Sequence, residues 1–424
     1  MKICIIGAGS SYTPELFEKF AQVTEYFPVK SVTLMDIDEK RLNAVTSFCK
    51  RYVQNLGFNV VIESTLDLDR AIYGSDFINT QIRVGGNKCR ILDEKIPISM
   101  GLIGQETTGA GGFIKALRTI PVMMDIVGSM NNNAPDAWLI NYANPTGIIS
   151  QAIHDSDISS RIKAKTVALC SGGIRPAWQV AEALGLDAKN VECDIFGLNH
   201  LNYAYNIKIN GRDITNDEFI KSAADYWDNS AELAIKIGAL FSGYLQYYYN
   251  KSKVIEKQRS SLQTRGEEVL ELEKEIFADF NNPDFCEKPP SLKKRGGDGY
   301  AQVAIDVMDA IYNDKSIRHV INVPNKGTFP FLPANAVIET AVTVDKSGIK
   351  PVAASPPPKP VWGLVSMVKN YEMMTAEAAL SGDKDLAVLA LTHHPLVGDY
   401  TIAKELFNKL LEANRDYLPE FWYR

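Results

Sequence analysis

A two-glycine turn directly after a short apolar run is the feature that most constrains how this chain folds. The run Ile3–Ile6 leads into Gly7-Ala8-Gly9, and the segment continues to Thr13 and Pro14. A short apolar run is typical of a buried parallel strand. The two glycines permit the tight turn and the close approach of a pyrophosphate that dinucleotide-binding folds require. We expect Thr13 to cap the helix that follows, with Pro14 at its first position.

The end of the second apolar run indicates which dinucleotide binds. The run Ser31–Met35 is followed by Asp36. An acid at this place accepts hydrogen bonds from the ribose hydroxyls and repels a 2′-phosphate, which favours NAD over NADP. The alternative is that Asp36 only caps the helix expected to begin near Asp38.

Further apolar runs alternate with helical stretches, which predicts an α/β fold with a Rossmann-type, doubly wound parallel sheet. We expect an NAD-binding domain over residues 1–170 and an α+β domain over residues 171–424 for substrate, metal and self-association. The length of 424 residues and the hydrophobic content of 46% suffice for a large core. The expected strands are Ser75–Thr80, Ala137–Asn141, Thr166–Cys170 and His319–Val323, and the expected helices are Thr264–Phe280, Tyr300–Ile311, Trp362–Leu380 and Tyr400–Ala413.

Charge and cysteine placement exclude several classes of function. The net charge is -6 at pH 7 and no Lys/Arg-rich run is present, so we expect no nucleic-acid partner. No apolar stretch approaches membrane-spanning length, and the start MKICIIGAG reads as a strand rather than a signal peptide. We therefore expect no membrane partner. The six cysteines have no CxxC spacing, which is typical of reduced thiols in a cytoplasmic protein.

Two residues far apart in the sequence suit one metal ion. Cys170 ends an expected strand, at the edge where open α/β sheets bind ligands, and His200 follows in Gly197-Leu198-Asn199-His200. A thiolate together with an imidazole suits Mn²⁺, Fe²⁺ or a similar divalent ion. Two protein ligands leave positions for substrate hydroxyls and water. The alternatives are a buried structural thiol and a histidine that is satisfied within the core or at the surface.

Several segments, spread over nearly the whole chain, carry a resemblance to a known family. They are Gly9–Leu16 (GSSYTPEL), Gly101–Gly109 (GLIGQETTG), Asn141–Gly147 (NYANPTG), Gly197–Leu201 (GLNHL) and Tyr244–Tyr248 (YLQYY), followed by Arg295-Gly296-Gly297 and Glu412–Arg415. In this order they resemble glycoside hydrolase family 4, the NAD- and metal-dependent glycosidases, and especially its 6-phospho-β-glucosidases. The resemblance implies a fold related to lactate and malate dehydrogenases, and assembly as a homodimer or homotetramer.

The resemblance also implies that the glycosidic bond is broken through a temporary oxidation. Cys170 and His200 would hold Mn²⁺ or another divalent metal, and C3 of the sugar would be oxidised by NAD⁺. Tyr244, as tyrosinate, would remove the C2 proton; the aglycone is then eliminated, water adds, and C3 is reduced again. A tyrosine can act in this way only if a nearby cation lowers its pKa from about 10. On pattern alone, with Tyr247 and Tyr248 beside it, Tyr244 reads as a helix-packing aromatic residue.

Further residues receive roles from the same resemblance. A sugar phosphate needs positive charge, and a guanidinium suits it because it donates two parallel hydrogen bonds. The alternatives are surface or structural roles for Arg83, Arg90 and Arg295, a solvated loop position for Glu106 and an ordinary turn before proline for Asn144. The expected cofactor-side residues are Gly7, Gly9, Ser10, Ser11, Asp36, Arg83 and Glu106, and the expected substrate-side residues are Arg90, Asn144, Ser171 and Arg295, with Arg175 as a further cation.

The residue after Cys170 departs from the family pattern. Asn is typical there in 6-phospho-β-glucosidases, Asp in 6-phospho-α-glucosidases and His in other members, whereas this chain has Ser171. Serine is too weak an acid to protonate a leaving group as Asp would, which disfavours an α-linked substrate that depends on such an acid but does not itself indicate a β-linked one. We predict hydrolysis of 6-phospho-β-glucosides, with a phosphorylated disaccharide or an aryl glucoside as the substrate.

Three other functions stay open at this point. One is a different activity of the same family, on a 6-phospho-α-glucoside or on an unphosphorylated or uronic sugar. Another is a lactate- or malate-type NAD dehydrogenase, which would need a catalytic histidine paired with an acid. The last is a non-catalytic NAD-binding regulator, which gives Cys170, His200 and Tyr244 no reason to occupy the family's positions.

Overall fold

Six parallel strands form the nucleotide-binding half of a nine-stranded sheet, in the order β3-β2-β1-β4-β5-β6. The computed structural model describes residues 1–170, 172–173, 175–214, 216–226, 230–295 and 299–424. The strand order reverses between β1 and β4, which is where doubly wound sheets bind ligands. The predicted Rossmann-type sheet is confirmed. Its strands are β1 (Lys2–Ile6), β2 (Ser31–Met35), β3 (Val61–Thr65), β4 (Phe77–Thr80), β5 (Trp138–Asn141) and β6 (Thr166–Ala168).

Three antiparallel strands from the second half of the chain extend the same sheet beyond β6. They are β11 (Ile317–Pro324), β12 (Val337–Asp345) and β13 (Gly348–Pro351). β11 meets β6 at the pair Asn322 and Ala168, which places β11 and β12 beside the segment that leads to Cys170. Both predicted domains therefore contribute to one sheet, and the division at residue 170 stays a prediction.

Alternating side chains of β1 pack into two separate hydrophobic cores, one on each face of the sheet. Ile3 and Ile5 face a core shared with α1 (Thr13–Gln22), α2 (Glu39–Asn55) and α15 (Tyr300–Asn313). Cys4 and Ile6 face the core on the other side of the sheet, which a second set of helices covers. This period of two is the reason why a strand of five residues can be buried on both faces. The second covering set consists mainly of α5 (Gly109–Asn133), α6 (Thr146–Asp155), α16 (Lys359–Ser381), α17 (Lys384–His393) and α18 (Tyr400–Ala413).

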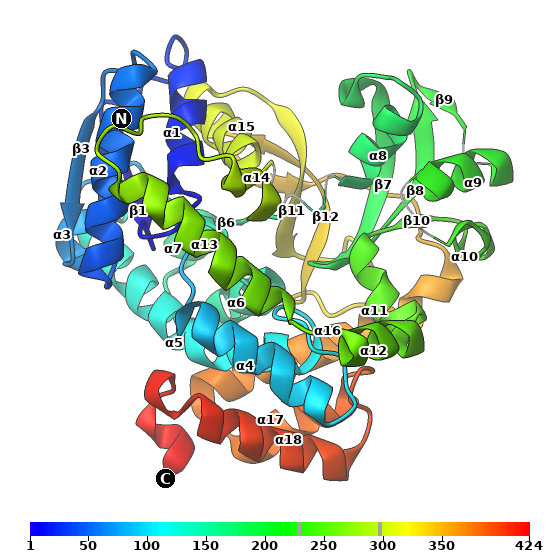
Figure 1. Cartoon of the computed structure of the whole chain (residues 1–424). Coiled ribbons are helices and arrows are strands. Elements are labelled where there is room, and N and C mark those ends of the chain that lie inside the picture. Colours follow the sequence, from blue (N-terminus) through cyan, green and yellow to red (C-terminus); the bar gives the residue numbers. More distant parts are fainter. Residues whose placement is uncertain (171, 174, 215, 227–229, 296–298) are drawn as a thin grey trace.

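Helix α13 (Arg265–Asn281) packs against α2 and α4 (Gly86–Ser99), and so joins the second half of the chain to the nucleotide-binding half (Figure 1). Thr264 starts it with a capping box, since its hydroxyl accepts from the Glu267 amide and the Glu267 carboxylate accepts from the Thr264 amide. The ring of Phe280 stacks on that of Phe48, with centroids 4.5 Å apart. The predicted helix over 264–280 is confirmed.

A smaller sheet carries the His200 segment. β7 (Val191–Leu198) and β8 (Leu201–Ile209) pair antiparallel, and β8 also pairs with β9 (Arg212–Asp213) and β10 (Leu240–Phe241). The tight connection between β7 and β8 consists of Asn199 and His200. A short 3-10 turn (Gly243–Leu245) directly after β10 places Tyr244 next to this connection.

The start of α1 differs from the sequence prediction. The residue before α1 is Tyr12, and Thr13 does not cap the helix. The Thr13 hydroxyl donates instead to the Ala8 carbonyl at 2.9 Å and accepts from the Gln81 amide at 2.6 Å. Thr13 therefore fastens the glycine turn to the end of β4.

The other predicted elements agree with the structure to within a few residues at each end. The strand over 319–323 and the helices over 300–311, 362–380 and 400–413 correspond to β11, α15, α16 and α18. Within the described residues, no helix has the length and apolar character required to cross a membrane. The remaining helices are α3 (Leu68–Ile72), α7 (Ser160–Ala164), α8 (Arg175–Ala183), α9 (Asp217–Tyr226), α10 (Ala231–Ile237), α11 (Gln246–Tyr249), α12 (Lys251–Ser260) and α14 (Ser291–Arg295).

Candidate active site

One cleft of about 1370 Å³ gathers nearly all of the predicted site residues. It lies at the carboxyl ends of the parallel strands, where the side chains from the two halves of the chain meet. Ser11 does not line it. Its hydroxyl is fully buried and donates to a Glu273 carboxylate oxygen at 3.3 Å. The predicted residues that do line the cleft are Gly7, Gly9, Ser10, Asp36, Arg83, Arg90, Glu106, Asn144, Cys170, Arg175, His200, Tyr244 and Arg295.

The glycine turn is closed by contacts that leave no room for larger side chains. Gly7 has a φ of +81°, and a Cβ there would lie 2.9 Å from the backbone of Gln81. The Gly9 amide donates to the Asp36 carboxylate at 2.8 Å. The helix after β2, α2, is capped by Asp38, which accepts from the Arg41 amide. Asp36 is therefore not the helix cap, and its carboxylate faces the cleft beside the glycine turn.

An asparagine at the end of β4 has no partner for either polar atom of its amide. Asn79 is 1% exposed and lines the cleft. Neither its Nδ2 nor its Oδ1 has a hydrogen-bond partner. A buried amide without partners is costly, so its place in the cleft fits a polar ligand that satisfies it.

Cys170 and His200 come together although they are distant in the sequence. The Cys170 Sγ lies 3.6 Å from the His200 Nε2, and both residues are buried. Burial lowers the pKa of His200 to about 3, so the imidazole is neutral at pH 7, as a metal ligand must be. Burial, with Glu339 nearby, raises the pKa of the Cys170 thiol to about 11. Within the described part of the chain, no cluster of three or more metal-binding side chains exists, so this pair stands as a two-ligand set.

The Tyr244 ring lies flat against the imidazole of His200, with centroids 4.0 Å apart. Burial and the neighbouring Cys170 raise the pKa of Tyr244 above its ordinary value. The Tyr300 hydroxyl lies 4.0 Å from the Cys170 sulfur and also lines the cleft. The structure therefore places a thiol, an imidazole and two phenols around one point.

Glu106 is surrounded by three cations at the edge of this group. Its carboxylate pairs with Arg83, with Arg90 at 3.2 Å and with Lys115 at 2.8 Å. Burial opposes ionisation, but Arg83, Lys115 and Arg90 together hold the pKa of Glu106 well below its usual range. Burial, with Arg83 nearby, lowers the pKa of Lys115 to about 7. Glu106 is therefore a largely buried, ionised carboxylate, 13% exposed, and not a solvated loop acid.

A second carboxylate, Glu273 of α13, holds Arg295 against the glycine turn. Arg295 Nη2 lies 2.9 Å from Glu273, and its guanidinium stacks on the Tyr12 ring at 4.1 Å. Glu273 also accepts from Asn87 at 2.9 Å and pairs with Arg41 at 3.2 Å. The Nε of Arg295 and the Oδ1 of Asn87 are buried without partners. The free Nε of Arg295 is a donor that fits a bound anion, and the free Oδ1 of Asn87 is an acceptor that fits a ligand hydroxyl.

Two further predictions have different outcomes. Asn144 lines the cleft, and its Oδ1 accepts from the Thr146 hydroxyl at 3.3 Å. Ser171 lies outside the described residues, as do Gly296 and Gly297 of the Arg295 segment.

Sequence reasoning did not identify four residues that shape the site. Lys115, Glu273 and Tyr300 line the cleft, and Glu339 lies buried behind it. A signal existed for two of them. Lys115 is a cation within the apolar segment Phe113–Leu117, and Glu339 is an acid within the apolar strand Val337–Val344. A charged residue at such a position is expected to have a buried partner.

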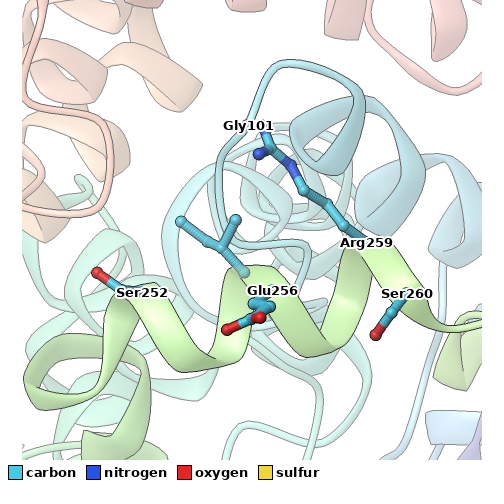
Figure 2. A pocket seen from close by; sticks show the side chains of 6 residues that line it. Gly101, Ser252, Glu256, Arg259 and Ser260 are labelled. Atoms are coloured by element: carbon cyan, nitrogen blue, oxygen red, sulfur yellow. The ribbon is translucent and has the colours of Figure 1, made fainter.

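A second hollow, of about 610 Å³, lies apart from the cleft between α12 and the turn at Gly101 (Figure 2). Arg259 reaches from α12 over Gly101, whose φ is +77°. None of the predicted site residues lines this hollow.

Comparison with known proteins agrees with the chemistry of the cleft. Residues 2–186 match the model of "Family 4 glycosyl hydrolase", and residues 195–397 match its C-terminal domain. A relative from Bacillus subtilis, named probable 6-phospho-beta-glucosidase, is 37% identical and aligns with 100% of this chain and 98% of its own.

Solved structures show the same similarity in three dimensions. The 6-phospho-beta glucosidase from Thermotoga maritima, solved with NAD and glucose-6-phosphate, is 31% identical, with a TM-score of 0.91 over 99% of both chains. A second form of that enzyme, with manganese, NAD⁺ and glucose-6-phosphate, is 32% identical over 99% of both chains, with a TM-score of 0.90. Malate dehydrogenase from Plasmodium falciparum, at 15% identity and a TM-score of 0.54 over 91% of this chain and 99% of its own, shares only the fold.

Proposed function

This chain belongs to glycosyl hydrolase family 4, and we propose that it hydrolyses 6-phospho-β-glucosides with the help of NAD and a divalent metal ion. The observation that carries the proposal is that the Cys170–His200 pair and the glycine turn line the same cleft. The relatives named above as 6-phospho-beta-glucosidases support this substrate class.

The residues present fit both groups. The Asp36 carboxylate beside the glycine turn and the unpartnered amide of Asn79 suit the polar parts of NAD. The neutral imidazole of His200 and the sulfur of Cys170 suit a divalent ion such as Mn²⁺. When bound, NAD supplies reversible hydride transfer at C3 of the sugar, and the metal supplies Lewis acidity at the neighbouring oxygens.

Tyr244 is the proposed base for the C2 proton of the sugar. Its ring stacks on His200, and its phenol is near enough to Cys170 for that residue to raise its pKa, so Tyr244 lies beside the proposed metal site. The pKa of Tyr244 is raised by burial, and a tyrosine can accept a proton there only when a positive charge opposes this effect. Arg90 lies close enough to act in that direction, and the metal ion would add to it.

The phosphate of the substrate is assigned to Arg295 and Arg90. The Nε of Arg295 has no partner at the cleft, which supports an anionic ligand at this end, and the free Oδ1 of Asn87 could accept from a hydroxyl of the same ligand. Arg90 lines the cleft and is shared between Glu94 at 2.9 Å and Glu106 at 3.2 Å. Asn144, at the turn after β5, is proposed to bind a sugar hydroxyl.

The test of the substrate class is the dependence on the 6-phosphate. We expect the chain to hydrolyse 4-nitrophenyl β-glucoside 6-phosphate, and to be inactive on the same glucoside without phosphate. Equal rates on the two compounds would contradict the assignment of Arg295 and Arg90 to a phosphate. An α-linked phosphorylated substrate is the second candidate within the family, and the same assay with the α anomer tests it.

We also propose that the protein acts in the cytoplasm as a homodimer or homotetramer. All six cysteines are free, as expected for a reducing compartment. Large apolar side chains are partly exposed on neighbouring helices, Met367 on α16 by 49% and Leu389 on α17 by 42%. Light scattering coupled to size-exclusion chromatography measures the assembly, and a monomer of 47.0 kDa would contradict it.

A further inference from the structure

We propose that Glu339 is a positioning residue that holds both proposed metal ligands, Cys170 and His200, from behind. The inference rests on the proposed function, because it concerns the metal site of that activity. Glu339 lies on β12, is fully buried and does not line the cleft. It therefore acts on the site only through the residues between it and the ligands.

Three asparagine amides converge on the Glu339 carboxylate. Oε1 accepts from Asn199 Nδ2 at 3.4 Å and from Asn322 Nδ2 at 3.3 Å. Oε2 accepts from Asn202 Nδ2. A carboxylate has only acceptor oxygens, so it can satisfy three amide donors at once, which no neutral side chain of similar size does.

Two of these asparagines flank His200. Asn199 precedes it and Asn202 follows two residues later, so Glu339 ties both sides of the connection between β7 and β8. His200 has a φ of +65°, a left-handed conformation that is uncommon for a residue with a Cβ. The two hydrogen bonds to Glu339 hold the residues on both sides of this turn.

The Cys170 segment rests on the same carboxylate. The Asn199 side chain also acts on Cys170, where it lowers the pKa of the thiol against the larger effect of burial. Asn322 donates to the Ala168 carbonyl at 3.1 Å, two residues before the cysteine. On the other side, the Gly173 backbone packs so closely that a Cβ there would lie 3.0 Å from the Glu339 Cδ. The hydrogen bonds of Asn322 before the cysteine and the close packing of Gly173 after it thus fix the position of Cys170 relative to β12.

The network continues to the proposed base. The Asn202 carbonyl accepts from the Ser242 amide at 3.1 Å, and the Ser242 hydroxyl accepts from the Tyr244 amide at 3.3 Å. One buried carboxylate therefore connects the thiol, the imidazole and the tyrosine. Because the separation of the first two decides whether one ion can contact both, Glu339 is expected to determine metal affinity without touching the metal.

The test is the affinity of the substrate-free protein for Mn²⁺ in the Glu339→Gln variant. Glutamine keeps the shape of glutamate but replaces one acceptor oxygen with an amide donor, which would face an asparagine amide donor. Mn²⁺ binding is measured by the loss of the free-ion signal in electron paramagnetic resonance. We expect affinity to fall by about 10- to 100-fold, the range seen when an outer partner of a metal ligand is removed.

The matched control is Glu372→Gln. Glu372 is also a buried carboxylate, paired with Lys369 at 2.5 Å, and it does not line the cleft. We expect this variant to lose thermal stability while it binds Mn²⁺ as the wild type does. A loss of stability alone therefore cannot account for weaker Mn²⁺ binding in Glu339→Gln.

A second variant, Asn322→Ala, keeps the carboxylate and removes one of its three donors, and it decides the question if Glu339→Gln does not fold. Weaker Mn²⁺ binding than in the wild type supports the inference, and wild-type affinity in either folded variant overturns it. If the wild type itself binds no Mn²⁺, the metal site of the proposed function is wrong and the inference falls with it.

Discussion

The imidazole of His200 and the phenol ring of Tyr244 lie parallel, with 9° between their planes and 4.0 Å between their centroids. This contact joins a proposed metal ligand directly to the proposed base. In the chain by itself, burial and Cys170 keep the pKa of Tyr244 above its ordinary value. A cation held by Cys170 and His200 would oppose both effects, so proton removal by Tyr244 is expected to depend on the metal.

Replacing Tyr244 with Phe keeps the ring stacking but removes the proton acceptor. We expect exchange of the C2 proton with solvent to slow by about 100-fold or more, the usual contribution of a general base. The measurement is deuterium incorporation at C2 during turnover in D₂O. The matched control is Tyr247→Phe, whose ring lies 6.1 Å from that of Tyr244. Equal exchange in Tyr244→Phe and in the control would assign the base to another residue.

Replacing Cys170 with Ser removes the sulfur from the proposed metal site. We expect Mn²⁺ affinity to fall by more than the about 10- to 100-fold that follows loss of an outer partner, and turnover to fall with it when metal is limiting. Cys193→Ser is the control, because Cys193 is a buried thiol on β7 that does not line the cleft. Unchanged activity of Cys170→Ser in metal-limited buffer would exclude Cys170 as a ligand.

Arg295→Gln tests the phosphate assignment. A hydrogen bond to a charged group contributes about 1.5–3 kcal/mol, so KM for the phosphorylated substrate should rise by about tenfold or more. We expect kcat to change less, because Arg295 lies at the glycine-turn end and not beside Tyr244. Arg318→Gln is the control, since Arg318 bonds to the Cys193 carbonyl away from the cleft. If both variants have the wild-type KM, the phosphate binds elsewhere.

A buried histidine outside the cleft predicts part of the acid sensitivity of the fold. His394 is 1% exposed, and burial lowers its pKa to about 3 from 6.5. Below pH 6.5 the unfolded chain binds a proton here that the folded chain does not, so stability is lost as the pH falls from 6.5 toward 3. In that window His394 contributes a slope of about 1.4 kcal/mol per pH unit to the free energy of unfolding.

Urea unfolding of the wild type and of His394→Gln at pH 6, 5.5 and 5 measures this contribution. Most other titrating groups are common to the two proteins, so the difference between their slopes isolates His394. We expect the variant to show the shallower pH dependence. Identical slopes would contradict the lowered pKa.

The nucleotide-binding half was predictable because its pattern is local. A short apolar strand, a glycine turn and an acid at the end of the second strand identify the sheet, and all of these lie within the first 36 residues. The extension of the sheet by β11 to β13 was not predictable in the same way, because strand pairing across a sheet depends on contacts between distant segments. The strand β11 itself was predicted, but its attachment to β6 was not.

The site was predictable to the extent that family motifs place residues at the ends of strands. Cys170, His200 and Tyr244 were assigned in this way, and the structure brings them together. The carboxylates Glu273 and Glu339 were missed, since most partners of each lie more than 100 residues away in the chain. Ser11 shows the same limit, because nothing in its local sequence indicates that its hydroxyl turns toward α13.

The central claim is tested most directly by hydrolysis of the paired α- and β-nitrophenyl glucoside 6-phosphates, with and without NAD⁺ and Mn²⁺ under reducing conditions. We predict cleavage of the β compound only when both additives are present, without stoichiometric accumulation of NADH. Cleavage that needs neither NAD⁺ nor Mn²⁺, or one NADH formed per substrate consumed, would contradict hydrolysis through a temporary oxidation.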